Sequence, residues 1–274
     1  MVTLCAIATQ RELIMPRHPP GTQSIQRTIL ILKTVAERKE IGWRLTDLAA
    51  HCGLEKATAH RILACLASER LLQQRAGDRR YIPGPVLFEL ALALPAYAAF
   101  KDAVHEELLR IANRTDGIAF LHLRSGEETI CVDRVGKSHV QPLTVIGTRR
   151  PMTESTAGVA MLLAMPKAAQ EEVLQSIHGA SRADAGRRTL VYRKILSKSR
   201  RHGFGVSLGD VVPGLAAIAL PVVDAMKRPF AAVSIMGPLS GFDEDRMQKL
   251  ARMLAGEARR IEREHRALIV EIAH

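Results

Sequence analysis

The sequence predicts an α+β protein in which a small helical domain ending in a β-hairpin precedes a larger domain of mixed helices and strands. Three observations carry this prediction. Three segments with helical periodicity and a hairpin fill the chain up to residue 84, Pro83, Gly84 and Pro85 interrupt it there, and strand-like and helical runs then alternate. With 274 residues, the chain is long enough for two domains with separate cores.

The first domain is expected to begin after a flexible extension, residues 1–22, which ends in RHPPGTQ. From Ser24 a helix is predicted, with a buried stripe formed by apolar residues at helical spacing: Ile25, Ile29, Leu32 and Val35. A short helix in LTDLAAHCGL follows, and Gly53 permits a tight turn after it.

A third, strongly amphipathic helix is predicted in EKATAHRILACLASERLL. Its apolar stripe contains Ala59, Ile62, Leu63 and Leu66, and its opposite face is polar and basic. LLQQRAGDRRYI then predicts a hairpin with Gly77 in its turn. Helix, helix, turn, helix and hairpin is the order of a winged helix-turn-helix, here residues 23–84, and the alternative is some other small α+β domain.

An apolar segment, VLFELALALPAYAAF, follows the joint at residues 83–85. Because it is apolar nearly all round, it predicts a linker helix over residues 85–100 that is buried in an inter-domain core or in a dimer interface. Residues 101–274 predict an α/β domain: strands in IAFLHL and TICVDRV, a helix opening near Ser155, another helix over 190–202, and three later strands.

Charge and composition narrow the class of protein. The chain has 39 Lys and Arg against 28 Asp and Glu, a net charge of +11, and a positive surface attracts polyanions such as nucleic acid. No apolar stretch is long enough to span a bilayer, and MVTLCAIAT lacks the basic start of a signal peptide. We therefore expect a cytoplasmic protein without a membrane partner.

The runs in both halves resemble the IclR family of bacterial transcriptional regulators, from about Ser24 to Ile261. In the first domain GLEKATAHRILACL and RRYIPGP carry the resemblance, and in the second GTRRPMTESTAGVAMLLA, HGFGV, PGLAAIALPV and FAAVSIMGP carry it. The resemblance implies a GAF-like effector-binding domain, a homodimer or homotetramer, and binding to a palindromic operator in double-stranded DNA. It leaves repression and activation open.

In such a protein the helix beginning near Glu55 presents its first residues to base edges in the major groove. The cations on it can donate to guanine or phosphate, the hydroxyl and imidazole can bond to phosphate, and the alanine, often a serine in this family, can contact a thymine methyl. The candidate DNA contacts on this helix are Lys56, Ala57, Thr58, His60 and Arg61.

Three further cations are candidates outside that helix. Arg79 and Arg80 lie on the wing, where contact with phosphate or the minor groove is expected, and Arg27 near the start of the first helix can reach the backbone. Each of these cations can instead be an ordinary solvated surface charge.

The resemblance also places an effector pocket between the sheet and the helix opening near Ser155. Free N–H groups and the positive dipole end at a helix start suit a carboxylate. The residues that the resemblance assigns to this pocket are Thr156, Ala157, Ser207, Leu215, Ala217, Ser234 and Met236.

Three of these residues depart from the pattern of family members that bind very small keto acids. Ser207 stands where an acid is usual, Ala217 where a cysteine is common, and Met236 where a second serine is found. The less polar pocket predicts a carboxylate metabolite with an apolar or aromatic body, held at one oxygen by Ser234. Alternatively, Ala217 and Met236 simply fill core, because strand residues alternate faces and the register is not fixed by sequence.

Catalytic motifs are absent from the sequence. It contains no GxSxG, P-loop or HExxH, and its four cysteines have no metal-ligand spacing, so we expect neither an enzyme nor a metal site or cofactor. The competing hypothesis is a winged-helix module that binds RNA or mediates protein contacts without a metabolite effector. RNA readers stack bases on aromatic side chains, and the first domain offers only Trp43 and Tyr81.

Overall fold

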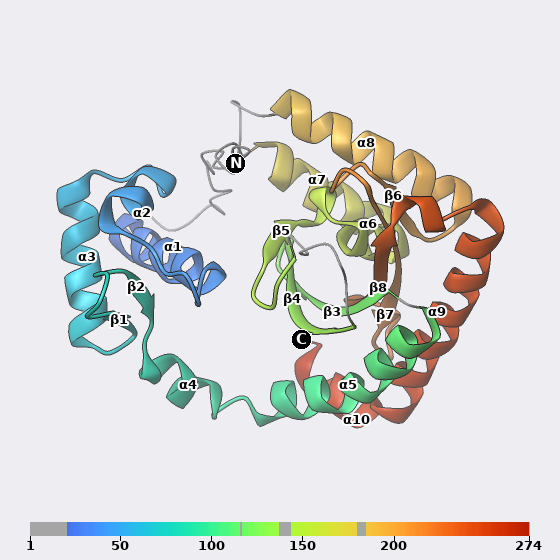
Figure 1. The fold of residues 1–274 in the computed structure, drawn as a ribbon, viewed down its shortest axis with the longest axis horizontal. Helices are drawn as coiled ribbons and strands as arrows, with labels where there is room; N and C mark the ends of the chain where they lie inside the picture. Colours follow the sequence, from blue (N-terminus) through green and yellow to red (C-terminus); the bar gives the residue numbers. More distant parts are fainter. Residues whose placement is uncertain (1–20, 116, 137–143, 180–184, 274) are drawn as a thin grey trace. The chain divides into compact units, whose positions relative to one another are not determined.

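The structure is a computed structural model that describes residues 21–115, 117–136, 144–179 and 185–273 (Figure 1). The chain forms two compact units that divide between Pro95 and Ala96. All but the last two residues of the expected N-terminal extension, 1–22, lie outside the described residues.

The first unit is a winged helix-turn-helix, as predicted. Its elements are α1 (Gln23–Glu37), α2 (Leu45–His51), α3 (Lys56–Ser68), β1 (Leu72–Gln74), β2 (Tyr81–Pro83) and α4 (Pro85–Ala91). The turn between α2 and α3 contains Gly53 at φ +62°, a left-handed conformation that glycine adopts without strain. Trp43 joins the hairpin to the helices, because it pairs with Tyr81 and its indole N–H donates to the carbonyl of Thr34.

The buried face of α1 differs from the predicted stripe. Val35 is buried, but Ile25 and Ile29 are exposed, and the helix instead buries Leu30 and Ile31 beside it. Thr34 is buried with them, since its carbonyl accepts from the Trp43 indole. The apolar residues of this helix cover more than one face. The face that contains Leu30, Ile31 and Val35 is the one that packs into the core with Trp43.

The segment expected as one buried helix over 85–100 forms two helices in the structure. The helix α4 ends at Ala91, and a second helix, α5 (Pro95–Thr115), starts at a proline, which fits a first helical turn but not a helix interior. No residue of α4 is buried within the chain: Phe88 is 69% exposed and Leu90 is 58% exposed.

The second unit is built on a six-stranded antiparallel sheet in the order β5-β4-β3-β8-β7-β6. The strands are β3 (Ile118–Ser125), β4 (Glu128–Val135), β5 (Arg149–Pro151), β6 (Gly205–Leu208), β7 (Leu215–Val223) and β8 (Pro229–Pro238). This curled sheet, with helices on both sides, gives the α+β architecture that the sequence predicted (Figure 1).

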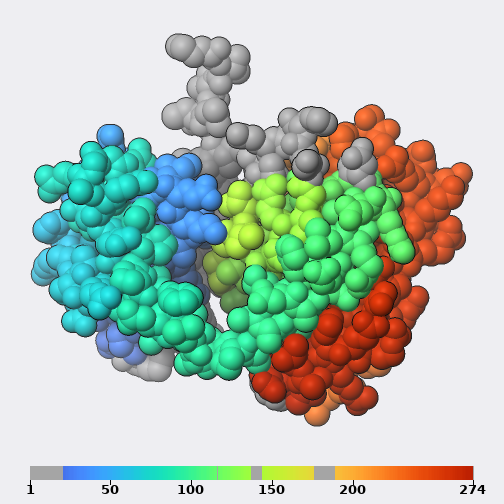
Figure 2. Space-filling view, turned by 60° about the horizontal axis from the view of Figure 1, so that its bottom comes forward, coloured from blue at the N-terminus to red at the C-terminus, as the bar shows by residue number. Residues whose placement is uncertain are grey.

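Helices cover both faces of this sheet. On one side lie α5, α9 (Glu244–Glu264) and α10 (Arg266–Ile272), and on the other lie α6 (Thr156–Ala164), α7 (Lys167–Gly179) and α8 (Ala185–His202) (Figure 1). Short 3₁₀ turns, η1 (Met152–Glu154) and η2 (Leu239–Gly241), precede α6 and α9. The larger core forms between the sheet and the α5 and α9 side. In Figure 2, α9 and α10 form part of the red surface.

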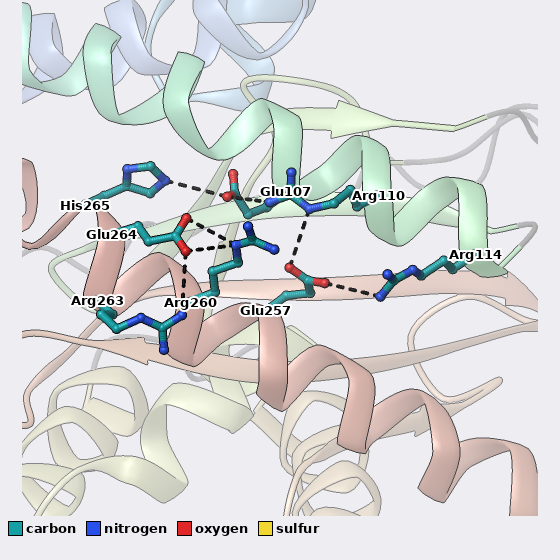
Figure 3. Close-up of polar contacts among 8 residues, drawn as sticks. All are labelled: Glu107, Arg110, Arg114, Glu257, Arg260, Arg263, Glu264 and His265. Atoms are coloured by element: carbon teal, nitrogen blue, oxygen red, sulfur yellow. Dashed lines mark hydrogen bonds and ion pairs between the residues drawn. The ribbon is translucent and has the colours of Figure 1, made fainter.

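A row of charged side chains links α5 to α9 (Figure 3). The buried carboxylate of Glu107 accepts a hydrogen bond of 2.6 Å from Arg110, and the buried Glu257 lies 3.6 Å from Arg114. His265, at the start of α10, lies 3.7 Å from Glu107. A buried carboxylate without a cation is strongly destabilising, so these pairs restrict how the two helices can pack.

Within the described residues, no helix is both long and apolar enough to cross a membrane. The same part of the chain contains no group of three or more His, Cys, Asp or Glu residues placed to hold a metal ion.

Candidate functional site

The exposed face of α3 carries the side chains predicted to contact DNA. The helix starts at Lys56 after the extended residue Glu55, and Ala59, Leu63 and Leu66 are buried beneath it. Of the five candidates, Thr58 is half-buried. The other four are exposed: Lys56, Ala57, His60 and Arg61. The helix therefore presents a polar, basic surface from its first turns onward.

The two wing arginines differ in their surroundings. Arg80 donates to the carbonyl of Gly42 at 3.2 Å and forms an ion pair with Asp78, so its guanidinium is engaged inside the unit. Arg79 is exposed at φ +56° in the turn of the hairpin. Arg75 also joins Asp78 and the chain before Gly42, so the hairpin is fixed while Arg79 projects from it. Arg27, on α1, is half-buried.

A pocket lies on the α6 side of the sheet in the second unit. Because strand side chains alternate between faces, Phe120 and His122 of β3 line this pocket, whereas Ala119 and Leu121 belong to the core on the other face. On β8, Ser234 and Met236 line the pocket in the same way. The pocket therefore depends on the same strand register as the core.

The start of α6 closes one side of the pocket. Ser155 caps the helix, since its hydroxyl accepts from the N–H of Gly158 at 3.3 Å. Thr156 and Ala157 line the pocket, and their N–H groups lie in the first turn, where no carbonyl of the helix can accept them. At Gly205 on β6 a Cβ would come within 2.6 Å of the Thr156 carbonyl, so glycine permits this close approach.

All seven residues expected around an effector line this one pocket: Thr156, Ala157, Ser207, Leu215, Ala217, Ser234 and Met236. Ala217 and Met236 are register partners on β7 and β8 and line the pocket. Met236 also belongs to a small apolar cluster against which Ala217 packs, so the two residues pack as core and border the cavity at the same time. The hydroxyl of Ser207 already accepts from the N–H of Val211 at 3.4 Å.

Two polar side chains in the wall border the cavity and form no hydrogen bond among the described residues. Ser234 is 5% exposed and His122 is 9% exposed. Ser234 pairs in register with Phe120, and His122 lies two residues farther along β3, so both project from neighbouring strands on the same face. Neither side chain has a polar atom fully enclosed by protein, so a ligand that enters the pocket can hydrogen-bond to both.

The electrostatics of the pocket favour an anion. Arg150 of β5 lines it, and its positive charge adds to the burial that lowers the pKa of His122 to about 4. At neutral pH His122 is therefore an uncharged imidazole, which can donate one hydrogen bond and accept another. The positive charge of Arg150 and the helix start at Thr156 both attract a negatively charged ligand.

Sequence reasoning missed several residues of this pocket, including Phe120, His122, Thr129, Thr148 and Arg150. A signal existed for the first two, because an aromatic and a histidine two residues apart in a strand share a face. Arg150 stands within the run GTRRPMTESTAGVAMLLA, in which the sequence predicts the helix but not the strand before it. The pairing of β5 with β4 is what brings it to the pocket.

The pocket is small in this structure. Its cavity measures about 60 Å³, whereas pockets that hold drug-sized ligands measure roughly 300–1,000 Å³. Much of the wall is apolar, and Met236 is its most adaptable member, because an unbranched thioether has several low-energy rotamers.

Two family models match the chain. A model of the IclR helix-turn-helix domain matches residues 24–76, and a model described as bacterial transcriptional regulator IclR C-terminal matches residues 98–263. The two matches correspond to the unit with the exposed α3 face and to the unit with the pocket.

Curated relatives align over most of their length. The chain is 27% identical over 247 residues to the transcriptional repressor IclR of Escherichia coli strain K12, covering 87% of this chain and 88% of that protein. It is 26% identical over 257 residues to the HTH-type transcriptional regulator KdgR of the same strain, covering 90% and 94%.

Solved structures share the fold. An IclR family transcriptional regulator from Brucella abortus superposes with a TM-score of 0.70 at 17% identity, covering 91% of this chain and 97% of that one. An IclR homolog complexed with 4-hydroxybenzoate from Microbacterium hydrocarbonoxydans gives 0.66 at 22% identity, covering 89% and 99%.

The low pKa of His122 predicts a specific pH dependence of stability. The unfolded histidine, with a pKa of 6.5, takes up a proton before the folded one does, at about 4. The free energy of unfolding should therefore be unaffected by this group above pH 6.5 and fall by about 3 kcal/mol as the pH drops to 4. Denaturant unfolding at each pH measures this, and His122→Gln should show a shallower fall.

His60→Gln is the matched control, because it makes the same substitution at a histidine that is exposed on α3. If the wild-type and His122→Gln profiles have the same slope between pH 6.5 and 4, the prediction that His122 is a buried, neutral imidazole is wrong.

Proposed function

Because the chain belongs to the IclR family of bacterial transcriptional regulators, we propose that it binds a palindromic DNA operator as a homodimer or homotetramer and that a small carboxylate metabolite modulates this binding. Members of the family are transcriptional regulators and not enzymes. The observation that carries the ligand-responsive part is the pocket, in which Ser234 and His122 border the cavity from neighbouring strands and form no hydrogen bond among the described residues.

The DNA-binding part of the proposal assigns different roles to α3 and to the wing. Arg61 and Lys56 are exposed on the recognition helix, so we assign them to base edges in the major groove, with the polar neighbours at phosphates. Arg79 is the wing cation assigned to phosphate or the minor groove, because the guanidinium of Arg80 is engaged with Gly42 and Asp78.

The effector part assigns the carboxylate to the positive end of the pocket. Arg150 supplies charge, and the N–H groups of Thr156 and Ala157 point from the helix start. Ser234 and the neutral His122 can each donate to a ligand oxygen. An apolar or aromatic body is supported by the wall around Ala217 and Met236, and a solved structure with this fold contains an aromatic acid, 4-hydroxybenzoate.

The cavity volume supports a competing ligand class. A cavity of about 60 Å³ is far smaller than the roughly 300–1,000 Å³ of pockets for drug-sized ligands, which favours a compact two- or three-carbon acid. A ring-sized acid requires the side chain of Met236 and its neighbours to move on binding. We favour the larger acid because the acidic residue and the second serine associated with small keto acids are replaced here by Ser207 and Met236.

Assembly is the third part of the proposal. The short helix α4 exposes Phe88 and Leu90, and Leu92 and Leu94 follow in the same exposed state. Four neighbouring apolar side chains in water favour burial against a second copy. A two-fold dimer also matches the symmetry of a palindromic operator.

Substitution of the DNA-facing arginines should separate base reading from backbone contact. Arg61→Ala should weaken operator binding by about 1–3 kcal/mol and leave non-operator duplexes nearly unaffected, whereas Arg79→Ala should weaken both. Gel-shift titrations with an operator selected from random duplexes measure the difference. Lys39→Ala, at an exposed cation after α1, serves as the control. Unchanged operator affinity in Arg61→Ala would refute the assignment of this side chain.

Ligand class can be decided by calorimetric titration of aromatic acids beside pyruvate and glyoxylate. Aromatic acids should bind more tightly, and Met236→Ser should shift the ranking toward the small acids. Ser234→Ala should weaken binding by about 1–2 kcal/mol, since a ligand oxygen loses its donor. Ser197→Ala, at an exposed serine of α8 that does not line the pocket, is the control. If only the small keto acids bind, the prediction of a larger ligand is wrong.

Disruption of the exposed apolar row should prevent assembly. Leu90→Asp introduces a charge into the expected interface, so the protein should sediment as a monomer at micromolar concentration. The matched control is Leu190→Asp on α8, because the two leucines have the same exposed fraction, 58%, in different units. A monomeric wild-type chain, or an unchanged assembly in Leu90→Asp, contradicts this part of the proposal.

A further inference from the structure

The helix α8 has a charge composition unlike that of α9, another long helix of the same unit. Its sequence contains seven Lys and Arg and no Asp or Glu, whereas α9 has six basic and five acidic residues. Surfaces usually intersperse both signs, because like charges one helical turn apart repel. The concentration of one sign on α8 therefore opposes its own helical structure and requires an explanation outside the helix.

Four of these cations form one exposed face. Arg193 and Arg200 lie seven residues apart, as do Lys194 and Arg201, which places each pair on one side of the helix about 10.5 Å apart. We call these four residues the α8 basic face. The opposite side buries Tyr192, Ile195 and Ser199, so the orientation of the helix is fixed along β6 at the edge of the sheet (Figure 1).

Two acids near this helix are paired with other side chains of α8, outside the basic face. Asp210 pairs with Lys198 at 2.7 Å, and Glu244 pairs with His202 at 3.2 Å. Among the described residues, none of the four side chains of the α8 basic face has an acidic partner. Its positive charge is therefore available to an external anion.

The helix dipole explains only part of this pattern. Cations in the last turn are stabilised by the negative end of a helix, which accounts for Arg200 and Arg201. The effect falls off within one turn, so it does not account for Arg193 and Lys194 two turns earlier. These two positions indicate selection for an external partner.

We propose that the α8 basic face binds the phosphate backbone of duplex DNA outside the operator sequence. A second copy of this face would bring like charges together, so a two-fold contact between copies is unfavourable. A lipid surface requires a row of apolar side chains to insert, and Leu190 is the one large apolar residue exposed among the described residues of this helix. Regularly spaced phosphates match a row of cations without any need for base contacts.

The inference rests on the proposed DNA-binding function and adds a second contact region to it. Neutralisation of the face in the full chain, as Arg193→Gln, Lys194→Gln, Arg200→Gln and Arg201→Gln together, tests it. Fluorescence anisotropy would follow three duplexes: the minimal operator, the operator with flanks of about two helical turns on each side, and a non-operator duplex of that longer length.

The variant should bind the minimal operator like the wild type and lose affinity for both long duplexes. Each phosphate contact contributes a salt exponent of about 0.9. Between about 50 and 200 mM salt, the affinity of the wild type for the long duplexes should therefore fall on the order of 100-fold more than the affinity of the variant. The matched control carries the same charge change on exposed residues of α9 and α10: Lys249→Gln, Arg252→Gln, Arg259→Gln and Arg266→Gln.

Several outcomes overturn the inference. These are unchanged affinity and salt dependence of the α8 variant on the long duplexes, an equal loss in the control variant, or a loss of binding to phosphatidylserine vesicles without any loss on DNA. Failure of the wild type on the minimal operator alone would instead refute the proposed operator function. In that case the non-operator duplex still decides whether the α8 basic face binds DNA.

Discussion

Both faces of the central strands in the second unit are buried, and the rest of that unit depends on this constraint. On β3 and β8, alternate residues pack into the apolar core against α5 and α9, and the residues between them face α6. A one-residue shift in register would send Ser234 and His122 into the apolar core and Val233 into the pocket. The large apolar core therefore stabilises the register that assembles the pocket.

The polar groups in the pocket oppose stability, and the surrounding packing offsets this. A buried hydroxyl or imidazole without a partner costs about 1–3 kcal/mol. His122 reduces part of that cost by remaining uncharged, since burial and Arg150 lower its pKa to about 4. Both side chains border the cavity, so a ligand that enters it can hydrogen-bond to them.

Charge is used in different ways in different parts of the chain. Between α5 and α9, the buried carboxylates Glu107 and Glu257 are matched by Arg110 and Arg114 of α5, which makes this contact specific (Figure 3). In the wing, Arg75 and Arg80 fix the hairpin while Arg79 stays exposed. On α8 the cations have no acidic counterpart within the helix. The net charge of +11 thus contains both structural and surface contributions.

The sequence by itself determined the winged helix-turn-helix, the two-part architecture and the seven residues around the pocket, because periodicity, turn residues and family motifs are local signals. It did not determine which side of α1 is buried, since Ile25 and Leu30 are both apolar and only packing against the rest of the first unit distinguishes them. It also did not identify Arg150 or His122 as neighbours in the pocket. Their proximity arises from the pairing of β3, β4 and β5, and strand pairing is a long-range property that no local pattern encodes.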